Sequence, residues 1–196
     1  AATLSSAQEA RPVASPRTTT AYVLVVTDAE GAVTTDTVTV TVAEPPLAEA
    51  GADRAVCPGS SVVLQSRVQG GRGPYRFLWS PAGGLNNPES PNPIAAPGRT
   101  TRYVLTVTDA LGCSSKDSLT VQVHPGIEAD AGGAITACAN APTPLLVKVA
   151  GGTPPYKYAW SPATGLDNPA AQSPVLIPRS DATYIVTVTD ANGCFD

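Results

Sequence analysis

The residues of this chain best suited to do chemistry are its four cysteines, Cys57, Cys113, Cys138 and Cys194. Cys57 and Cys138 lie 81 residues apart, and so do Cys113 and Cys194. An even number of cysteines at matched positions predicts disulfides and therefore an oxidising compartment. A zinc site is disfavoured, because the chain has no Cys-x-x-Cys pair and only one histidine.

The sequence offers few residues from which a catalytic site could be formed. His124 stands alone in a His-Pro-Gly sequence, which is typical of a linker, and no paired carboxylates stand out. No glycine-rich phosphate loop leads from a strand into a helix. We therefore expect no enzymatic activity, and no cofactor apart from the calcium ion considered below.

The charge of the chain is sparse and slightly acidic. It carries 12 Lys and Arg against 16 Asp and Glu, for a net charge of −4, and the basic residues form no cluster. This argues against nucleic acid and anionic membranes as partners. No apolar run approaches the ~20 residues of a membrane helix, so we expect no direct membrane insertion. Because the sequence starts at Ala1 and contains no Met, we expect it to be a segment of a longer polypeptide.

The cysteines belong to a longer repeat. Tyr103–Cys113 recurs as Tyr22–Ala32 and as Tyr184–Cys194, each time 81 residues away. A fixed period of this size indicates an array of equivalent modules. The neighbouring repeats of the same chain are thus the first expected partners, followed by further copies of the chain in a fibre.

The period divides the chain into one whole module and two incomplete ones. Residues 1–44 match the C-terminal half of a module, 45–125 form a complete one, and 126–196 form a third that lacks its last strand. A module without its closing strand exposes a sheet edge and part of its core. Either adjoining chain completes it, or a neighbouring subunit donates a strand.

Composition and periodicity predict short strands. With 20 Pro and 17 Gly, the chain alternates turns with Val- and Thr-rich segments. Tyr75, Phe77 and Trp79 alternate with outward residues, which predicts a half-buried antiparallel strand with both tryptophans of the chain in module cores rather than on sugar-binding surfaces. Further strands are expected at 61–68, 93–96, 101–109 and 117–123.

Six or seven such strands, with Trp79 on the third main strand and Tyr103 entering the sixth, describe an immunoglobulin-like sandwich in which Tyr103 forms a tyrosine corner. No helical periodicity is present. We therefore predict an all-β fold of immunoglobulin-like β-sandwiches with an 81-residue period, arranged head to tail.

Strand topology bears on the cysteine pairing. Cys57 precedes the second strand at the C-terminal end of its module, whereas Cys113 follows the sixth strand at the other end. A nine-residue strand spans about 30 Å, whereas a disulfide needs Cα atoms within about 7 Å. We therefore favour a disulfide between modules, Cys57 with Cys194. The alternatives are pairing within modules, Cys57 with Cys113 and Cys138 with Cys194, and free thiols at all four positions. Cys113 and Cys138 would then pair with cysteines outside the sequence.

An aspartate recurs at the same turn of every repeat, as Asp28, Asp109 and Asp190. One interpretation is turn chemistry, in which the carboxylate accepts hydrogen bonds from its own loop. The other is a calcium ion held at the junction between modules, which needs six to eight oxygens. Its expected ligands are Asp109 with Glu49, and Asp190 with Asp130 or Glu128.

Two long strings carry a resemblance to a known family. Tyr158–Pro169 and Thr183–Cys194, together with the opening segment Ala48–Ser60, resemble the PKD-like repeats of large surface adhesins of Bacteroidetes-type gliding bacteria with type IX secretion. The Trp-Asp-Phe-Gly-Asp-Gly signature of the wider PKD family is absent. The resemblance implies a secreted, surface-attached, non-catalytic repeat in an extracellular location.

The same resemblance extends to a modification signal. Asp36-Thr37-Val38 and Asp117-Ser118-Leu119 fit a short pattern similar to the O-glycosylation signal of those bacteria, with Thr37 and Ser118 on the outward face.

Three functions follow as hypotheses. The first is a structural segment of a long extracellular adhesin or filament that projects a distal region from the cell surface. The second is a carbohydrate- or protein-binding module that uses the Pro/Asn-rich loops at 82–93 and 163–174. The third is an accessory module of a secreted hydrolase.

Overall fold

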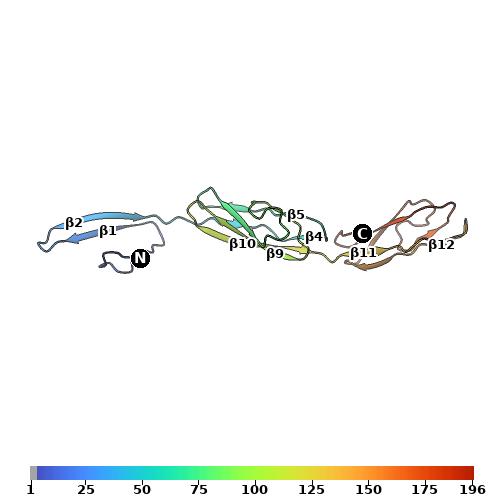
Figure 1. Ribbon diagram of the computed structural model, residues 1–196, viewed down its shortest axis with the longest axis horizontal. Coiled ribbons are helices and arrows are strands. Elements are labelled where there is room, and N and C mark those ends of the chain that lie inside the picture. Colours follow the sequence, from blue (N-terminus) through green and yellow to red (C-terminus); the bar gives the residue numbers. More distant parts are fainter. Residues whose placement is uncertain (1–3) are drawn as a thin grey trace.

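A computed structural model describes residues 4–196, so the first three residues of the predicted segment 1–44 lie outside the described part. The chain forms an elongated row of three bodies joined end to end (Figure 1). All regular elements in the described residues are strands. None of the described residues belongs to a helix that could span a membrane. The predicted all-β fold is confirmed.

The strands fall into three groups along the chain. The first body is a ribbon of β1 (Thr20–Thr27) and β2 (Val33–Val40). The middle module contains β3 (Leu47–Glu49), β4 (Arg54–Val56), β5 (Val62–Val63), β6 (Arg67–Gln69), β7 (Arg76–Ser80), β8 (Ile94–Ala95), β9 (Thr101–Thr108) and β10 (Ser114–Val123). The third module contains β11 (Ile127–Asp130), β12 (Thr143–Pro144), β13 (Lys148–Gly151), β14 (Lys157–Ser161), β15 (Val175–Leu176) and β16 (Ile185–Thr189).

The middle module is built around a four-stranded sheet in the order β4-β10-β9-β7. β9 pairs antiparallel with both neighbours, whereas β10 and β4 run parallel. Tyr103, Leu105 and Val107 alternate along β9 and are fully buried. Because successive side chains of a strand point to opposite faces, the period of two read from the sequence places these residues in the core.

Each tryptophan lies in the core of its module. Trp79 is 1% exposed and Trp160 is 6% exposed. Each indole N–H donates to a backbone carbonyl, from Trp79 to Ser90 (3.1 Å) and from Trp160 to Ala171 (3.0 Å). The buried rings act as packing residues whose polar atom is satisfied.

Tyr103 also departs from the expected tyrosine corner. Its hydroxyl donates to the carbonyl of Gly83, 20 residues upstream, at 2.9 Å, so it ties the strand to the loop after β7 rather than to the residues just before it. Burial raises the pKa of the Tyr103 hydroxyl. In the third module Tyr184 makes the matching bond to Thr164, at 2.7 Å.

Replacing Tyr103 with phenylalanine should lower the free energy of unfolding of the middle module by about 1–2 kcal/mol, because the hydrogen bond from the buried tyrosine to the Gly83 carbonyl is lost. The matched change Tyr184→Phe should have a smaller effect, since Tyr184 is only partly buried and water can replace its hydroxyl. Urea denaturation followed by tryptophan fluorescence measures both. Equal losses for the two variants would contradict this account.

The strand expected over 61–68 is interrupted. β5 pairs with β8 and β6 pairs with β3, so the chain changes partner between them. Across the break, Leu64 N–H donates to the Pro93 carbonyl and Ser66 N–H donates to Oδ1 of Asn92. β8 lies within the expected edge segment at 93–96, whereas the sequence analysis gave no range for the strands that precede Cys57, which are β3 and β4.

The third module is open along one edge of its sheet. β16 starts at Ile185, although the equivalent β9 starts at Thr101, which corresponds to residue 182. The residues equivalent to β4, Ile135–Ala137, form no strand. Both changes follow from the lack of a strand in the place of β10, because a strand needs a ladder partner to satisfy its backbone groups.

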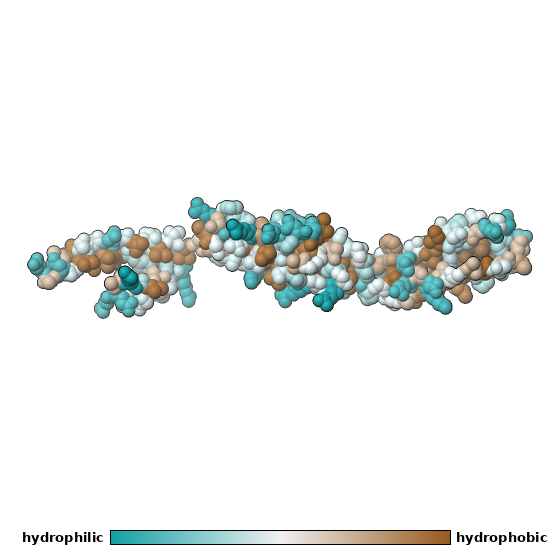
Figure 2. Space-filling model, in the orientation of Figure 1, coloured by the Kyte–Doolittle hydropathy of each residue, from teal (hydrophilic) through white to brown (hydrophobic). Residues whose placement is uncertain are grey.

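The ribbon at the other end exposes residues that are core in the middle module. Leu24 and Val38 are 61% and 62% exposed, whereas their equivalents Leu105 and Leu119 are buried. Apolar residues run along this ribbon in the surface view (Figure 2). The described residues therefore hold one complete core, one partly open core and one ribbon without an opposing sheet.

Candidate functional site

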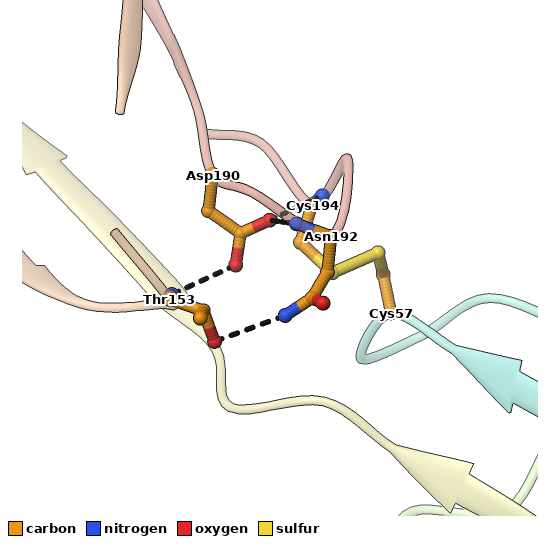
Figure 3. Close-up of a disulfide and its surroundings, with 5 residues drawn as sticks. All are labelled: Cys57, Thr153, Asp190, Asn192 and Cys194. Carbon is orange, nitrogen blue, oxygen red and sulfur yellow. Dashed lines mark hydrogen bonds between the residues drawn. A yellow bond between two sulfur atoms is a disulfide. The ribbon is translucent and has the colours of Figure 1, made fainter. Parts of the chain in front are cut away.

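A disulfide joins the middle module to the third. Cys57 and Cys194 are bonded with a Cα–Cα distance of 5.4 Å, across 137 residues of sequence (Figure 3). This is the inter-module pairing that strand topology favoured. Cys113 precedes the first residue of β10, whereas Val56, beside Cys57, pairs with its last residue, Val123. The ten residues of β10 therefore hold Cys57 and Cys113 roughly 30 Å apart.

The linker between the two modules is short. β10 ends at Val123 and β11 begins at Ile127. His124 N–H donates to the Val56 carbonyl at 2.9 Å, which holds the start of the linker against the segment that carries Cys57. Two covalent connections, the linker and the disulfide, therefore join the middle module to the third at what we call the joint. This double connection restricts the relative motion of the modules.

Asp190 shapes the turn that presents Cys194. Its Oδ1 accepts the N–H groups of Asn192 (2.8 Å) and Cys194 (2.9 Å), and its Oδ2 accepts the N–H of Thr153 (2.9 Å). The Asn192 side chain donates to Oγ1 of Thr153 at 2.9 Å (Figure 3). The turn is thus fixed to the Gly-Gly-Thr loop before β14, with Cys194 facing Cys57.

The electrostatics of Asp190 follow from these donors. Burial opposes ionisation and would raise the pKa of the carboxyl. The backbone amides of Thr153, Cys194 and Asn192, assisted by His124, outweigh burial and hold the pKa of Asp190 below its usual value. The ionised form is therefore the one that the joint stabilises.

This shift predicts a pH dependence. Because the pKa of Asp190 is lower in the folded state, its contribution is present above the unfolded value of about 4 and is lost as the pH falls below it. Melting curves between pH 7 and pH 3 should show a loss of stability in acid that is smaller in Asp190→Asn. Asp181→Asn, at an exposed position, is the control and should match the parent chain. An unchanged acid slope in Asp190→Asn would refute the assignment.

The same turn recurs in the other repeats. Oδ1 of Asp109 accepts the N–H groups of Leu111 and Cys113, both at 2.9 Å, and Oδ2 accepts the Arg72 N–H at 3.1 Å. Oδ1 of Asp28 accepts those of Glu30 and Ala32. The structure thus places the three recurring aspartates in turn stabilisation.

In the part of the chain that the structure describes, no cluster of side chains supports the calcium interpretation. No three His, Cys, Asp or Glu side chains come together there in an arrangement that could hold a metal ion. Glu49, predicted as a ligand together with Asp109, accepts a hydrogen bond from Gln69. Asp130 accepts the Gly132 N–H.

Calcium binding at the module junction can be tested with a chelator. Since Asp109 and Asp190 already accept backbone amides with both oxygens, we expect the melting temperature to be unchanged when a chelator is added in excess. A drop on chelation that calcium reverses would instead place an ion at the joint.

The two remaining cysteines are free in this chain. Cys113 is partly exposed and Cys138 is exposed. Each lies in the same local turn as its bonded counterpart: the Ser60 N–H donates to the carbonyl of Cys57 (3.0 Å), and the Ala141 N–H donates to that of Cys138 (3.1 Å). Pairing of Cys113 and Cys138 with cysteines of other modules stays a prediction.

The residues predicted to carry glycans lie on the outer faces of strands. Thr37 is exposed on β2, and Ser118 is partly covered on β10. The Ser118 hydroxyl accepts two hydrogen bonds from the Arg102 guanidinium. Glycosylation of both stays a prediction.

Thr153 and Asn192 were not identified from the sequence. The role of Thr153 could have been found by aligning the Gly-Gly-Thr loop with Gly70-Gly71-Arg72, since both loops donate a backbone N–H to the recurring aspartate. The side-chain bond between Thr153 and Asn192 has no counterpart in that alignment, because the middle module has Arg72 and Leu111 there.

No protein-family model matches the chain, and no curated protein matches it. Among solved structures, it is similar to the N-terminal eight Ig domains of Down Syndrome Cell Adhesion Molecule isoform 1.30.30, at 17% identity and a TM-score of 0.50, over 87% of this chain and 25% of that one. The chain therefore spans about a quarter of that structure. This likeness shows an Ig-like tandem fold.

Weaker likenesses include extracellular domains 3–5 of Drosophila OTK and a titin fragment, A168169. The first has 10% identity and a TM-score of 0.38, covering 90% of this chain and 67% of that one. The second has 13% identity and a TM-score of 0.38, covering 78% and 95%. Because both TM-scores are below 0.5, we draw no inference from these two likenesses.

Proposed function

We propose that this chain is a structural segment of a long extracellular adhesin or filament, in which disulfide-linked Ig-like modules hold a distal region away from the cell surface. The observation that carries the proposal is the Cys57–Cys194 disulfide, because it links consecutive modules rather than the two sheets of one module. Such a bond prevents the modules from separating under tension. It also requires an oxidising, extracellular-type compartment.

The force path through the chain follows from the position of the bond. A pull on the two ends reaches Cys57, crosses the disulfide and leaves at Cys194. Residues 58–193, which contain most of the middle module and the third module, are thereby shielded from the load. A segment that transmits tension gains from this arrangement, since residues 58–193 cannot extend while force passes through a covalent bond. β3 and β4 precede Cys57 and stay in the force path.

The repeat sequences support an origin in surface adhesins. The strings Tyr158–Pro169 and Thr183–Cys194 resemble PKD-like repeats of gliding, type IX-secreting bacteria, which are secreted, surface-attached and not enzymes. The Ig-like tandem fold agrees with that resemblance in architecture. We infer the same location and absence of catalysis for this chain.

The polar side chains of the Pro/Asn-rich loops form hydrogen bonds within their own loops. Oδ1 of Asn86 accepts the N–H groups of Asn87 and Ile94, and Oδ1 of Asp167 accepts those of Asn168 and Val175. These bonds give the loops a structural role. Ligand binding by the loops, and an accessory role beside a hydrolase, stay predictions without an observation that favours them.

Single-molecule pulling tests the proposal. With the chain held by its two ends, residues 58–193 should not extend until a reductant is added. Reduction should then release an extra contour length of roughly 450–490 Å, given about 3.3–3.6 Å per residue for those 136 residues. Release of that length under oxidising conditions would overturn the proposal that the disulfide carries the force.

A further inference from the structure

The turn that carries Cys194 contains a reactive pair of residues, Asn192 and Gly193. It is the only Asn-Gly sequence in the chain. Asparagine followed by glycine is the sequence most prone to deamidation, because the nitrogen of the glycine attacks the side-chain amide and no Cβ hinders its approach. The position of the asparagine holds Leu111 in the middle module and Glu30 in the first body. Among the three matching turns, this chemistry is therefore confined to the third module.

The folded turn engages both reacting groups in hydrogen bonds. The Gly193 N–H, which contains the attacking nitrogen, donates to the Asp190 carbonyl at 3.1 Å. The side-chain amide of Asn192, which would be attacked, donates to Oγ1 of Thr153 at 2.9 Å. Figure 3 shows this amide directed at Thr153, on the loop before β14. Both groups must leave these partners before they can react with each other.

Cys194 fixes the end of this turn. It is 2% exposed and is bonded to Cys57 of the middle module. Its N–H donates to Oδ1 of Asp190 at 2.9 Å, and its carbonyl accepts the Asp190 N–H at 2.8 Å. Because the residue two positions after Asn192 is held covalently, the backbone of the turn has little freedom to rotate. The disulfide therefore restrains the local opening that deamidation requires.

We propose that Asn192 is a deamidation site controlled by the joint: it stays an asparagine while the Cys57–Cys194 bond is closed, and it converts when the turn opens. In the reaction the Gly193 nitrogen forms a bond to Cγ of Asn192 and gives up its hydrogen, and the side-chain nitrogen leaves as ammonia. Water then opens the cyclic imide at one of its two carbonyls and returns a hydrogen to the Gly193 nitrogen. The product is aspartate or isoaspartate, and no oxidant or reductant takes part.

Either product weakens the joint. Aspartate at position 192 replaces the amide that donates to Thr153 with a carboxylate, which has no proton to donate and lies close to the carboxylate of Asp190. Isoaspartate adds one carbon to the backbone between Asp190 and Cys194, so the N–H groups that bind Asp190 are displaced. A joint that has opened therefore keeps a permanent chemical mark. This inference goes beyond the proposed structural function and does not depend on it.

Ageing of the purified chain in a mildly alkaline buffer tests the proposal. Peptide mass spectrometry measures the loss of Asn192, and an isoaspartyl methyltransferase labels the isoaspartate that forms. We expect the folded, disulfide-bonded chain to convert at least about a hundredfold more slowly than the same chain unfolded in guanidinium chloride. Each tenfold difference corresponds to about 1.4 kcal/mol for opening the turn.

Variants that loosen the turn should speed the reaction. Cys57→Ala with Cys194→Ala should raise the rate of conversion at least about tenfold. Thr153→Val, which keeps the disulfide, should raise it about three- to tenfold, because the Asn192 amide loses its hydrogen-bond partner. Circular dichroism checks that each variant keeps its fold. If the cysteine variant unfolds, the rate in Thr153→Val decides.

Asn140 is an internal control in every sample. It is exposed, and the N–H of the next residue, Ala141, donates to the Cys138 carbonyl at 3.1 Å, as the Gly193 N–H donates within its own turn. Because alanine follows it, Asn140 should stay unchanged over the time in which Asn192 converts. To test the consequence for the joint, Asn192→Asp should lower the melting temperature more than Asn192→Leu, which places the residue of the middle module in the turn.

Three results would overturn the proposal. Equal rates at Asn192 in the folded, disulfide-bonded chain and in the unfolded chain, or in the parent and the loosened variants, would mean that the joint gives no protection. Conversion of Asn140 as fast as Asn192 would mean that the Asn-Gly pair is not the reactive site. None of these results bears on the pulling experiment, which measures whether the disulfide shields residues 58–193 from force, so the two proposals fail independently.

Discussion

Replacing both Cys57 and Cys194 with alanine should lower the free energy of unfolding by about 2–5 kcal/mol, in the range found for native disulfides of secreted domains. The bond closes a long stretch of sequence, because its two cysteines are separated by 137 positions, so its removal frees many conformations of the unfolded chain. Urea denaturation at pH 7 measures the loss. The relative orientation of the two modules should also broaden, which small-angle X-ray scattering detects as a less extended average shape.

The matched control for this experiment is Cys113→Ala with Cys138→Ala. It removes the same number of sulfur atoms from turns of the same kind, but both of these cysteines are free in the single chain. Measured at a concentration where the protein is monomeric, it should keep the stability and shape of the parent chain. An equal loss in the control would show that the effect comes from the turns and not from the bond.

Trp79→Ala should be the most damaging single core substitution, with a loss of about 3–5 kcal/mol in the middle module. Trp79 is 1% exposed, so its removal leaves a cavity that its neighbours Leu64, Tyr103 and Leu105 cannot close without strain. Ser90 also loses the donor to its carbonyl. Urea denaturation followed by circular dichroism measures the change, and the fluorescence of the remaining Trp160 reports the third module separately.

Two comparisons sharpen this result. Trp160→Ala should also destabilise its module, but by less, because Trp160 lies on a two-stranded sheet whose open edge lets the core adjust, whereas Trp79 lies in a four-stranded sheet. Leu111→Ala, at a residue 54% exposed, should change the stability by no more than about 0.5 kcal/mol. A neutral Trp79→Ala would mean that the tryptophan is a surface platform and not a packing residue.

Local patterns were sufficient to predict the elements with strong alternation. Tyr103, Leu105 and Val107 lie in the core because a strand buries every second residue, and no distant information is needed to see it. The recurring aspartates likewise make turn bonds that depend on residues two and four positions ahead. Here the sequence neighbourhood and the structure impose the same constraint.

Other elements depended on partners far away in sequence. The segment 61–68 alternates like one strand, yet it divides between β5 and β6, because its two parts pair with β8 and β3. β4 has no strong alternation and exists because β10 offers it a parallel edge. Its equivalent in the third module has no such neighbour and forms no strand.

The sequence by itself determined the repeating Tyr-to-Cys segments, the buried faces and the turn chemistry, since each of these rests on residues close together in the chain. Only the tertiary structure decided which cysteines bond. Cys57 and Cys113 share a module but lie at opposite ends of β10, whereas the head-to-tail packing of two modules brings Cys57 within 5.4 Å of Cys194, Cα to Cα. A disulfide forms where the backbones meet, and separation along the sequence does not predict that meeting.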